Sequence, residues 1–297
     1  MLFLIITMPN SDRPIHMSSY FINDLNQMYG YKALYLDWKK ENKTVQENKE
    51  DILNLKVPEY YRNITSKIKP YQNYNWKSID IYRKTYFGLS YFLHETNYRW
   101  LHRGSDDNVV NLKNLESFYE SIEQKYDPLN EKVILGCCTR HASTPGYLQG
   151  GCGFLYSRKA VELMLPIYED VIFNCKVSED VCHKQFLIRL NITIINATSL
   201  SFLGHPFSKE DSERIDKNDF HDLVPCPKQH IFPENLNQCG VFHGPVNKLV
   251  FLHHHADGGV TGIINRTKKV FAVKDEYVHF YFPYFRHPRL CNANMSK

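Results

Sequence analysis

The sequence predicts an α/β fold in which helices flank a mostly parallel central sheet. Apolar runs of strand length alternate with segments of helical periodicity from one end of the chain to the other. The 297 residues are 43% hydrophobic and 23% charged, which is ordinary for a globular protein with a substantial core. The net charge of +4 is small and evenly spread, so nucleic acid is not the expected partner.

The first part of the chain supplies two strands and a long helix. Residues 2–7 form a continuous apolar run, as expected for a strand that is buried on both faces. A second strand is predicted over 33–36, and the polar stretch 41–75 is expected to be mostly loop. Apolar residues spaced i, i+4, i+7 and i+11 then predict a helix with one apolar face: Tyr82, Tyr86, Leu89 and Leu93.

The alternation is expected to continue to the end of the chain. The predicted elements are a strand over 99–103, a polar turn over 104–108, a helix over 112–122, a strand over 133–135, a glycine-rich loop over 146–153, a helix over 158–164 capped by Ser157, a helix starting at Glu179 and capped by Ser178, and strands over 192–195 and 249–252.

Two pairs of acidic residues could carry chemistry. Asp106 and Asp107 follow a predicted strand, and ligands of open α/β sheets bind at the carboxyl ends of strands. Such carboxylates can hold a divalent cation that in turn holds a diphosphate, although a solvated turn would use the same residues. Glu179 and Asp180 begin a helix, where a carboxylate serves either as a general base or only as compensation for the helix dipole.

Glycines and histidines give two further candidates. Gly150-Gly151-Cys152-Gly153 would let the backbone approach a ligand, but any tight turn could use it, and the dinucleotide spacing G-x-G-x-x-G is absent. His253, His254 and His255 follow the last predicted strand, and one imidazole could complete a metal site. An exposed polar turn is the alternative. Because strand side chains alternate, His254 is expected to face away from its neighbours.

Cysteines and glycosylation sequons bear on the compartment. The eight cysteines include no C-x-x-C pair, so a zinc ribbon is not expected. Six N-x-S/T sequons begin at Asn42, Asn63, Asn191, Asn196, Asn265 and Asn294. Together they favour the secretory pathway, where disulfides persist. However, the run 2–7 is too short for a signal peptide, and no stretch approaches the roughly 20 apolar residues of a membrane helix. We therefore expect either a cytosolic protein or a catalytic part whose anchor lies outside this chain.

Taken in order, these elements resemble the fringe-like β-1,3-glycosyltransferases, and most of all the core 1 β-1,3-galactosyltransferases. The resemblance covers most of the chain. It is carried by Lys84-Thr85, by Trp100 ahead of Ser105-Asp106-Asp107, by Tyr147 to Phe154 with its glycines, by Ser178-Glu179-Asp180, by His205-Pro206-Phe207, and by the late strand with His254 and Asp257.

The resemblance implies a single GT-A-like domain over 1–297. A Rossmann-like nucleotide-sugar half would span about 1–125 and an acceptor half about 126–297. It implies inverting transfer of galactose from UDP-galactose to O-linked GalNAc of glycoproteins, with Mn²⁺ as the metal, in the lumen of the Golgi or secretory pathway and with a membrane anchor. The residues do not separate galactose from N-acetylglucosamine as the donor sugar, and they leave a homodimer open.

The resemblance also assigns roles to residues. Carried over by position, Asp107 and His254 would ligate the metal and Asp180 would be the catalytic base. The residues implied to lie near the donor are Thr7, Lys84, Asp106, Gly150 and Gly151.

The chain departs from this family at Ser105, where the family has the first Asp of an acidic triplet. A neutral hydroxyl cannot neutralise a cation, so weakened rather than abolished metal binding is expected. The same change supports an alternative: a catalytically inactive homologue that acts as a chaperone or binding partner of an active glycosyltransferase.

Overall fold

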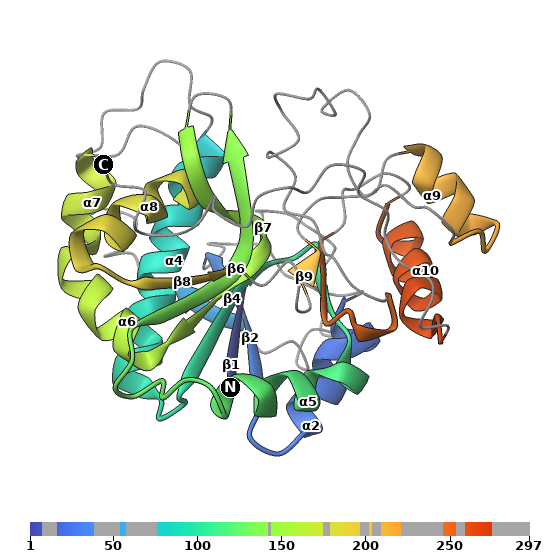
Figure 1. Cartoon of the computed structure of the whole chain (residues 1–297), viewed down its shortest axis with the longest axis horizontal. Helices are drawn as coiled ribbons and strands as arrows, with labels where there is room; N and C mark the ends of the chain where they lie inside the picture. Colours follow the sequence, from blue (N-terminus) through green and yellow to red (C-terminus); the bar gives the residue numbers. More distant parts are fainter. Residues whose placement is uncertain are drawn as a thin grey trace. The chain divides into compact units, whose positions relative to one another are not determined.

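The computed structural model describes residues 1–7, 17–38, 54–57, 76–141, 144–174, 179–196, 202–203, 209–220, 246–253 and 259–274. Within these residues the fold is α/β, with a mostly parallel central sheet and flanking helices (Figure 1), which confirms the predicted fold class. None of the described helices is long and apolar enough to cross a membrane.

The chain forms two compact units, each built from three segments. The first unit contains Met1–Asp106, Asp127–Ile134 and Leu155–Thr193, and the second contains Asp107–Tyr126, Leu135–Phe154 and Ile194–Lys297. The chain first crosses from the first unit to the second between Asp106 and Asp107. The division into halves over about 1–125 and 126–297 stays a prediction.

The larger sheet has seven strands in the order β3-β2-β1-β4-β7-β6-β8. Their bounds are β1 Leu2–Ile6, β2 Lys32–Trp38, β3 Asn54–Val57, β4 Trp100–Ser105, β6 Val133–His141, β7 Thr144–Ser157 and β8 Thr193–Asn196. Strand β1 is parallel to both of its neighbours, and Ile6 pairs with Leu36 on one side and Ser105 on the other. All of β1 is buried, as its continuous apolar run predicts.

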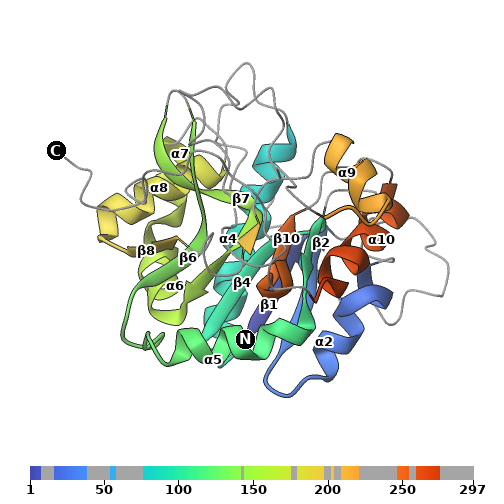
Figure 2. The same ribbon diagram turned by 45° about the vertical axis from the view of Figure 1, so that its right-hand side comes forward.

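Helices of the first unit lie together beside these strands in both views (Figures 1 and 2). They are α4 Trp76–Glu95, α6 Arg158–Met164, η3 Leu165–Ile167, α7 Tyr168–Asn174 and α8 Glu179–Leu190, while η1 Ser18–Ile22 and α2 Asn23–Gln27 connect β1 to β2. The predicted apolar face of α4 buries Tyr82 and Leu89. The predicted cap of α6 is also confirmed, because Ser157 Oγ accepts a hydrogen bond from the Ala160 amide at 3.2 Å.

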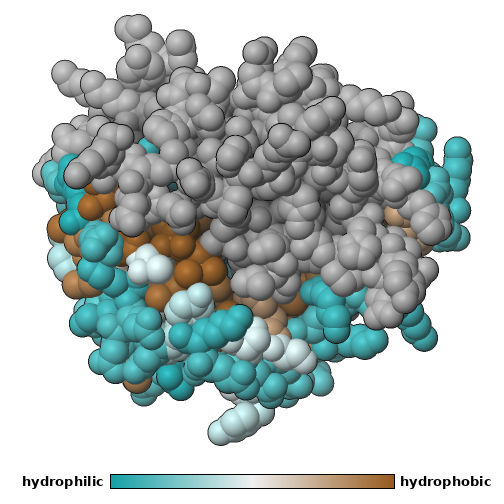
Figure 3. Space-filling model, in the orientation of Figure 1, coloured by the Kyte–Doolittle hydropathy of each residue, from teal (hydrophilic) through white to brown (hydrophobic). Residues whose placement is uncertain are grey.

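The second unit contains a small sheet in the order β5-β10-β9. Strand β10, Phe251–His253, runs antiparallel to β5, Asn108–Val110, and parallel to β9, Phe202–Leu203. The helices are α5 Leu112–Glu123, α9 Lys209–Asp216, η5 Val246–Lys248 and α10 Gly259–Ala272. Their core joins Ile215, Val246, Leu249, Leu252 and Val270. Helix α5 buries Leu115, Phe118 and Ile122, and the lower edge of the face in Figure 3, where α5 lies, is correspondingly hydrophilic.

Several local predictions were wrong. The glycine-rich stretch 146–153 is not a loop but belongs to β7. Within the stretch 41–75, which was expected to be mostly loop, the described residues form strand β3, and the others lie outside the described part of the chain. Both strands form because a neighbouring backbone offers hydrogen-bond partners, a cause that side-chain periodicity does not reveal. The acidic turn is also tighter than predicted: only Asp106 and Asp107 form it, since Ser105 ends β4 and Asn108 begins β5. Ser178, the predicted cap of α8, lies outside the described residues.

Candidate functional site

Three of the residues implied to lie near a donor come together at the carboxyl-terminal ends of β1 and β4 in the larger sheet. Thr7 and Asp106 follow the paired ends of β1 and β4, and the Asp106 amide donates to the Ile6 carbonyl at 3.1 Å. The ammonium group of Lys84 reaches from α4 and donates to the Thr7 carbonyl at 2.5 Å. The parallel strand order thus places these residues where open α/β sheets bind ligands.

Burial limits what these three side chains can do by themselves. Thr7, Lys84 and Asp106 are 3%, 0% and 3% exposed. The Thr7 hydroxyl donates to the Leu36 carbonyl at 3.1 Å, so it ties the end of β1 to β2. Lys84 secures the same end of β1 from the helix side. The observed contacts of Thr7 and Lys84 hold the carboxyl-terminal end of β1 in place. The role of all three residues in donor binding stays a prediction.

Asp107 meets a histidine within the second unit. Its Oδ1 lies 3.6 Å from His253 Nε2, and the two side chains are only 20% and 13% exposed. This separation is longer than a hydrogen bond. His254, the residue implied as the ligand, lies outside the described residues, whereas His253 ends β10 directly opposite Asn108.

Gly151 makes room for the His253 ring. A Cβ at position 151 would lie 2.5 Å from both Cε1 and Nδ1 of His253, a distance that side chains do not tolerate. The close neighbour at this glycine is therefore a side chain of the protein. The roles of Gly150 and Gly151 in donor binding stay predictions.

Asp107 and His253 fit a shared divalent cation. Two ligands that each lie about 2.1 Å from one ion are about 3–4 Å apart, and a carboxylate with an imidazole suits Mn²⁺ or a similar ion. Among the described residues, no group of three or more His, Cys, Asp or Glu side chains is placed to hold a metal. Any further ligands from this part of the chain must therefore be of another type.

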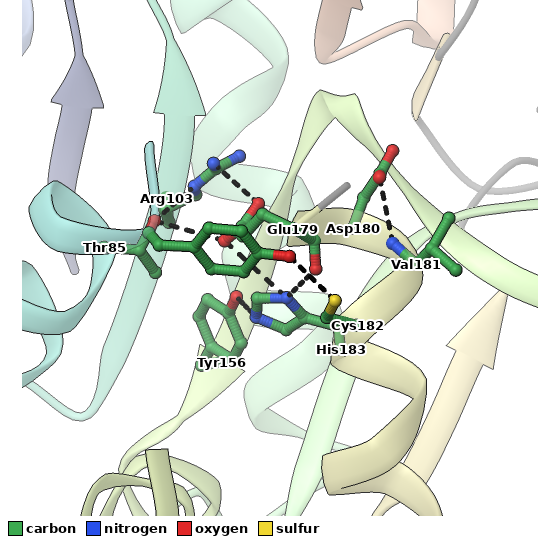
Figure 4. A network of polar contacts seen from close by, with 9 residues as sticks. Thr85, Arg103, Tyr156, Glu179, Asp180, Val181, Cys182 and His183 are labelled. Carbon is green, nitrogen blue, oxygen red and sulfur yellow. Dashed lines mark hydrogen bonds and ion pairs between the residues drawn. The ribbon is translucent and has the colours of Figure 1, made fainter. Parts of the chain in front are cut away.

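The carboxylates at the start of α8 have different surroundings. Glu179 is buried, and its Oε2 accepts from the Arg103 guanidinium at 2.8 Å while Oε1 accepts from the Thr85 hydroxyl at 3.1 Å. Asp180 is half-buried, and its Oδ1 accepts from the Val181 amide at 2.9 Å. Figure 4 shows Glu179 turned toward Arg103 and Thr85 and the Asp180 carboxylate turned away from them. Glu179 therefore belongs to a structural ion pair, and the role of Asp180 as a catalytic base stays a prediction.

His183 continues this buried network one turn along α8. Its Nδ1 lies 3.0 Å from the Glu179 carbonyl and its Nε2 lies 2.6 Å from the Tyr156 hydroxyl (Figure 4). Burial raises the pKa of Tyr156 well above its ordinary value, and the Glu179 charge adds to this, so the phenol stays a donor. His183 Nδ1 then donates to the carbonyl and Nε2 accepts from the phenol, which is the neutral form of the ring.

Acid is expected to destabilise the protein through His183. Burial lowers the pKa of His183, outweighing the opposing effect of Glu179, so the unfolded chain takes up a proton at higher pH than the folded one. Stability from this residue is present above about pH 6.5 and falls as pH drops toward the lower folded pKa, by up to about 1.4 kcal/mol per pH unit.

Urea unfolding from pH 7.5 to 5 tests this expectation. His183→Gln keeps an acceptor for Tyr156 and should flatten the pH profile, whereas His94→Gln, at an exposed position, should leave it unchanged. Parallel profiles for the wild type and His183→Gln would contradict the assignment.

A surface pocket of about 800 Å³ in the first unit contains none of the predicted site residues. It is lined by Tyr86, Leu93, His94, Glu162, Leu165, Pro166, Glu169 and Asp170. Its carboxylates are already engaged: Glu169 accepts from the Tyr86 hydroxyl, Asp170 pairs with Arg189, and Glu162 pairs with Lys159. The pocket therefore offers no unpaired acidic group for a ligand.

The structure thus brings some predicted residues together and leaves others apart. Thr7, Lys84 and Asp106 meet in the first unit, which also contains Asp180. Asp107, Gly150 and Gly151 belong to the second unit. The convergence of Asp107, His254 and Asp180 on one pocket stays a prediction. Sequence reasoning missed Arg103 and Asn108, since only the strand register shows what they face.

No protein-family model matches the chain, and no curated protein matches it by sequence. Among solved structures, the chain is similar to the galactosyltransferase LgtC in complex with donor and acceptor sugar analogs, with 10% identity over 93% of this chain and 97% of that one and a TM-score of 0.48. It is similar to mouse xyloside xylosyltransferase 1, with 9% identity over 67% and 85% and a TM-score of 0.41.

A third similar structure is a glycosyltransferase involved in the glycosylation of the major capsid of PBCV-1, with 10% identity over 67% and 84% and a TM-score of 0.40. All three are glycosyltransferases, but every TM-score lies below 0.5.

Proposed function

We propose that the protein is an inverting β-1,3-glycosyltransferase that transfers galactose from UDP-galactose to O-linked GalNAc of glycoproteins. The observation that carries the proposal is the pair of Asp107, the second residue of the acidic turn, and His253, with Oδ1 and Nε2 3.6 Å apart. Asp107 directly follows Asp106 in the sequence, and Asp106 lies with Thr7 and Lys84 at the carboxyl-terminal ends of β1 and β4. Along the chain, a residue of the candidate metal pair thus directly follows a residue proposed to bind the nucleotide.

Asp107 and His253 would hold the divalent metal, Mn²⁺ in this proposal. When bound, the metal stabilises the negative charge that develops on the diphosphate leaving group without a proton transfer. The carboxyl-terminal ends of β1 and β4, with Asp106, would bind the nucleoside part of the donor. Gly151 keeps the imidazole of His253 close to Asp107, because any larger residue would displace the ring.

Asp180 would take the proton from the acceptor hydroxyl. A hydroxyl is a poor nucleophile until a carboxylate accepts its proton. In an inverting displacement the hydroxyl attacks the sugar carbon from the face opposite the diphosphate, so the base must stay free of metal. Asp180 suits this role because Glu179 makes the ion pair with Arg103 and the Asp180 carboxylate is turned away from that pair.

A panel of UDP-sugars with a GalNAc-bearing peptide and Mn²⁺ tests the proposal. We expect mass spectrometry to show one added hexose from UDP-galactose, and NMR of the product to show a β-1,3 linkage. A product with retained configuration would overturn the inverting mechanism, and no transfer from any donor would overturn the enzyme assignment.

Ser105 supports a second candidate function, that of an inactive homologue that folds or binds an active transferase. The family's first acidic residue would add a negative charge beside the cation, and a serine hydroxyl does not. A chaperone would need neither Mn²⁺ nor Asp180. The donor panel therefore separates the two candidates directly.

The lumen of the secretory pathway is the proposed location, as it would be for a transferase of glycoproteins. The sequon asparagines Asn191 and Asn265 are both exposed, so attached glycans would fit the folded protein. Cys182 is disulfide-bonded in the structure, which supports an oxidising compartment.

A further inference from the structure

Asn108, the first residue of β5, has a buried side chain whose oxygen is unsatisfied among the described residues. The residue is 4% exposed, and its Oδ1 has no hydrogen-bond partner within the described part of the chain. Its Nδ2 donates a long hydrogen bond of 3.4 Å to the Gly151 carbonyl. A buried carbonyl oxygen without a partner is unfavourable, so Asn108 holds an acceptor ready for a group that the described residues do not supply.

The position of Asn108 points to the candidate metal pair. In the antiparallel pairing of β5 and β10, Asn108 lies directly opposite His253, so the two side chains share one face of the small sheet. Asn108 also follows Asp107 in the chain, and Asp107 Oδ1 lies 3.6 Å from His253 Nε2. Gly151 lies beside both Asn108 and His253. Its carbonyl accepts a hydrogen bond from Asn108, and the absence of a side chain leaves room for the His253 ring.

A carboxamide oxygen is a suitable third ligand for a cation bound by Asp107 and His253. Hard divalent cations bind carboxamide oxygens as well as carboxylates. Two protein ligands leave an ion weakly held, and the described residues offer no third His, Cys, Asp or Glu for it. Ser105, in place of the family's first acidic residue, brings only a neutral hydroxyl.

We propose that Asn108 Oδ1 is the third protein ligand of a divalent cation bound by Asp107 and His253. The inference rests on the metal dependence in the proposed function and deepens it by assigning a residue outside the family's acidic motif. The carboxamide adds an oxygen ligand without adding charge.

Titration of the full chain with MnCl₂, followed by electron paramagnetic resonance of free Mn²⁺, tests the assignment without any activity. Asn108→Leu, which keeps the volume and removes the oxygen, should weaken Mn²⁺ binding about 10- to 100-fold. The matched control is Asn111→Leu, at another buried asparagine whose Nδ2 donates to the Leu249 carbonyl, and it should bind Mn²⁺ like the wild type. His253→Ala should lose binding.

A second variant decides the question if Asn108→Leu does not fold. Asn108→Asp buries a carboxylate that only a cation would neutralise, so Mn²⁺ should raise its melting temperature more than that of the wild type. Equal Mn²⁺ affinity in Asn108→Leu and wild type, or an equal Mn²⁺ effect on the melting temperature in Asn108→Asp, overturns the inference and leaves the proposed function intact. A wild type that binds no Mn²⁺ overturns the inference and the metal dependence together, and the donor panel then shows whether sugar transfer remains.

Discussion

Replacing Asp180 with asparagine is expected to slow sugar transfer by about 100- to 10,000-fold, because the acceptor hydroxyl loses its general base. The fold should survive, since an asparagine oxygen can still accept the hydrogen bond from the Val181 amide that Asp180 accepts at 2.9 Å. UDP and Mn²⁺ binding should be unchanged, because the base does not ligate the metal. Steady-state kinetics with isothermal titration of UDP measures both effects.

Asp170→Asn is the matched control for this variant. Asp170 also lies in the first turn of a helix, α7, and it is exposed and paired with Arg189. Its replacement should leave the transfer rate unchanged. Wild-type turnover in Asp180→Asn would remove Asp180 from the mechanism, and a protein that works without turnover would correspond to the inactive homologue.

Glu179→Gln is expected to lower the free energy of unfolding by about 3–5 kcal/mol, because it leaves the buried Arg103 charge without its carboxylate. The two side chains are only 6% and 4% exposed, and their atoms lie 2.8 Å apart. Thr85 and the backbone cannot replace the lost charge. Urea denaturation at pH 7.5 measures the effect.

The surface pair Lys159–Glu162 provides the control. Its side chains are 39% and 42% exposed, so solvent screens the pair and Glu162→Gln should change the free energy of unfolding by about 0.5 kcal/mol or less. The double variant Arg103→Met, Glu179→Leu should recover much of the loss, because it removes both buried charges. Equal effects of Glu179→Gln and Glu162→Gln would contradict the buried ion pair.

Local pattern was enough to predict much of the fold. Residues 2–7 are apolar throughout and form a fully buried β1, and the spacing of Tyr82, Tyr86 and Leu89 matches helix α4. The Ser157 cap was also correct. In each case the cause acts within a few residues of chain: burial on both faces, helical periodicity, or a side chain that bonds a nearby amide.

Pairing between distant segments was not predictable in this way. Strand β3 forms because β2 offers a parallel edge, and glycines 150, 151 and 153 lie in β7 and not in a loop. Helices α7, α9 and α10 were not predicted. A glycine-rich sequence predicts a turn when the neighbouring strand is not known, because glycine adopts turn and extended conformations easily.

The sequence by itself determined the α/β class, the acidic turn at Asp106 and Asp107, and the carboxylates at the start of α8. These follow from residue type and short-range spacing. Only the tertiary structure decided that Glu179 forms an ion pair with Arg103, that His253 lies beside Asp107, and that Asn108 lies opposite His253 on the neighbouring strand. Register and burial depend on which backbones pair, and a residue's neighbours across a sheet are set by contacts between segments more than 140 residues apart along the chain.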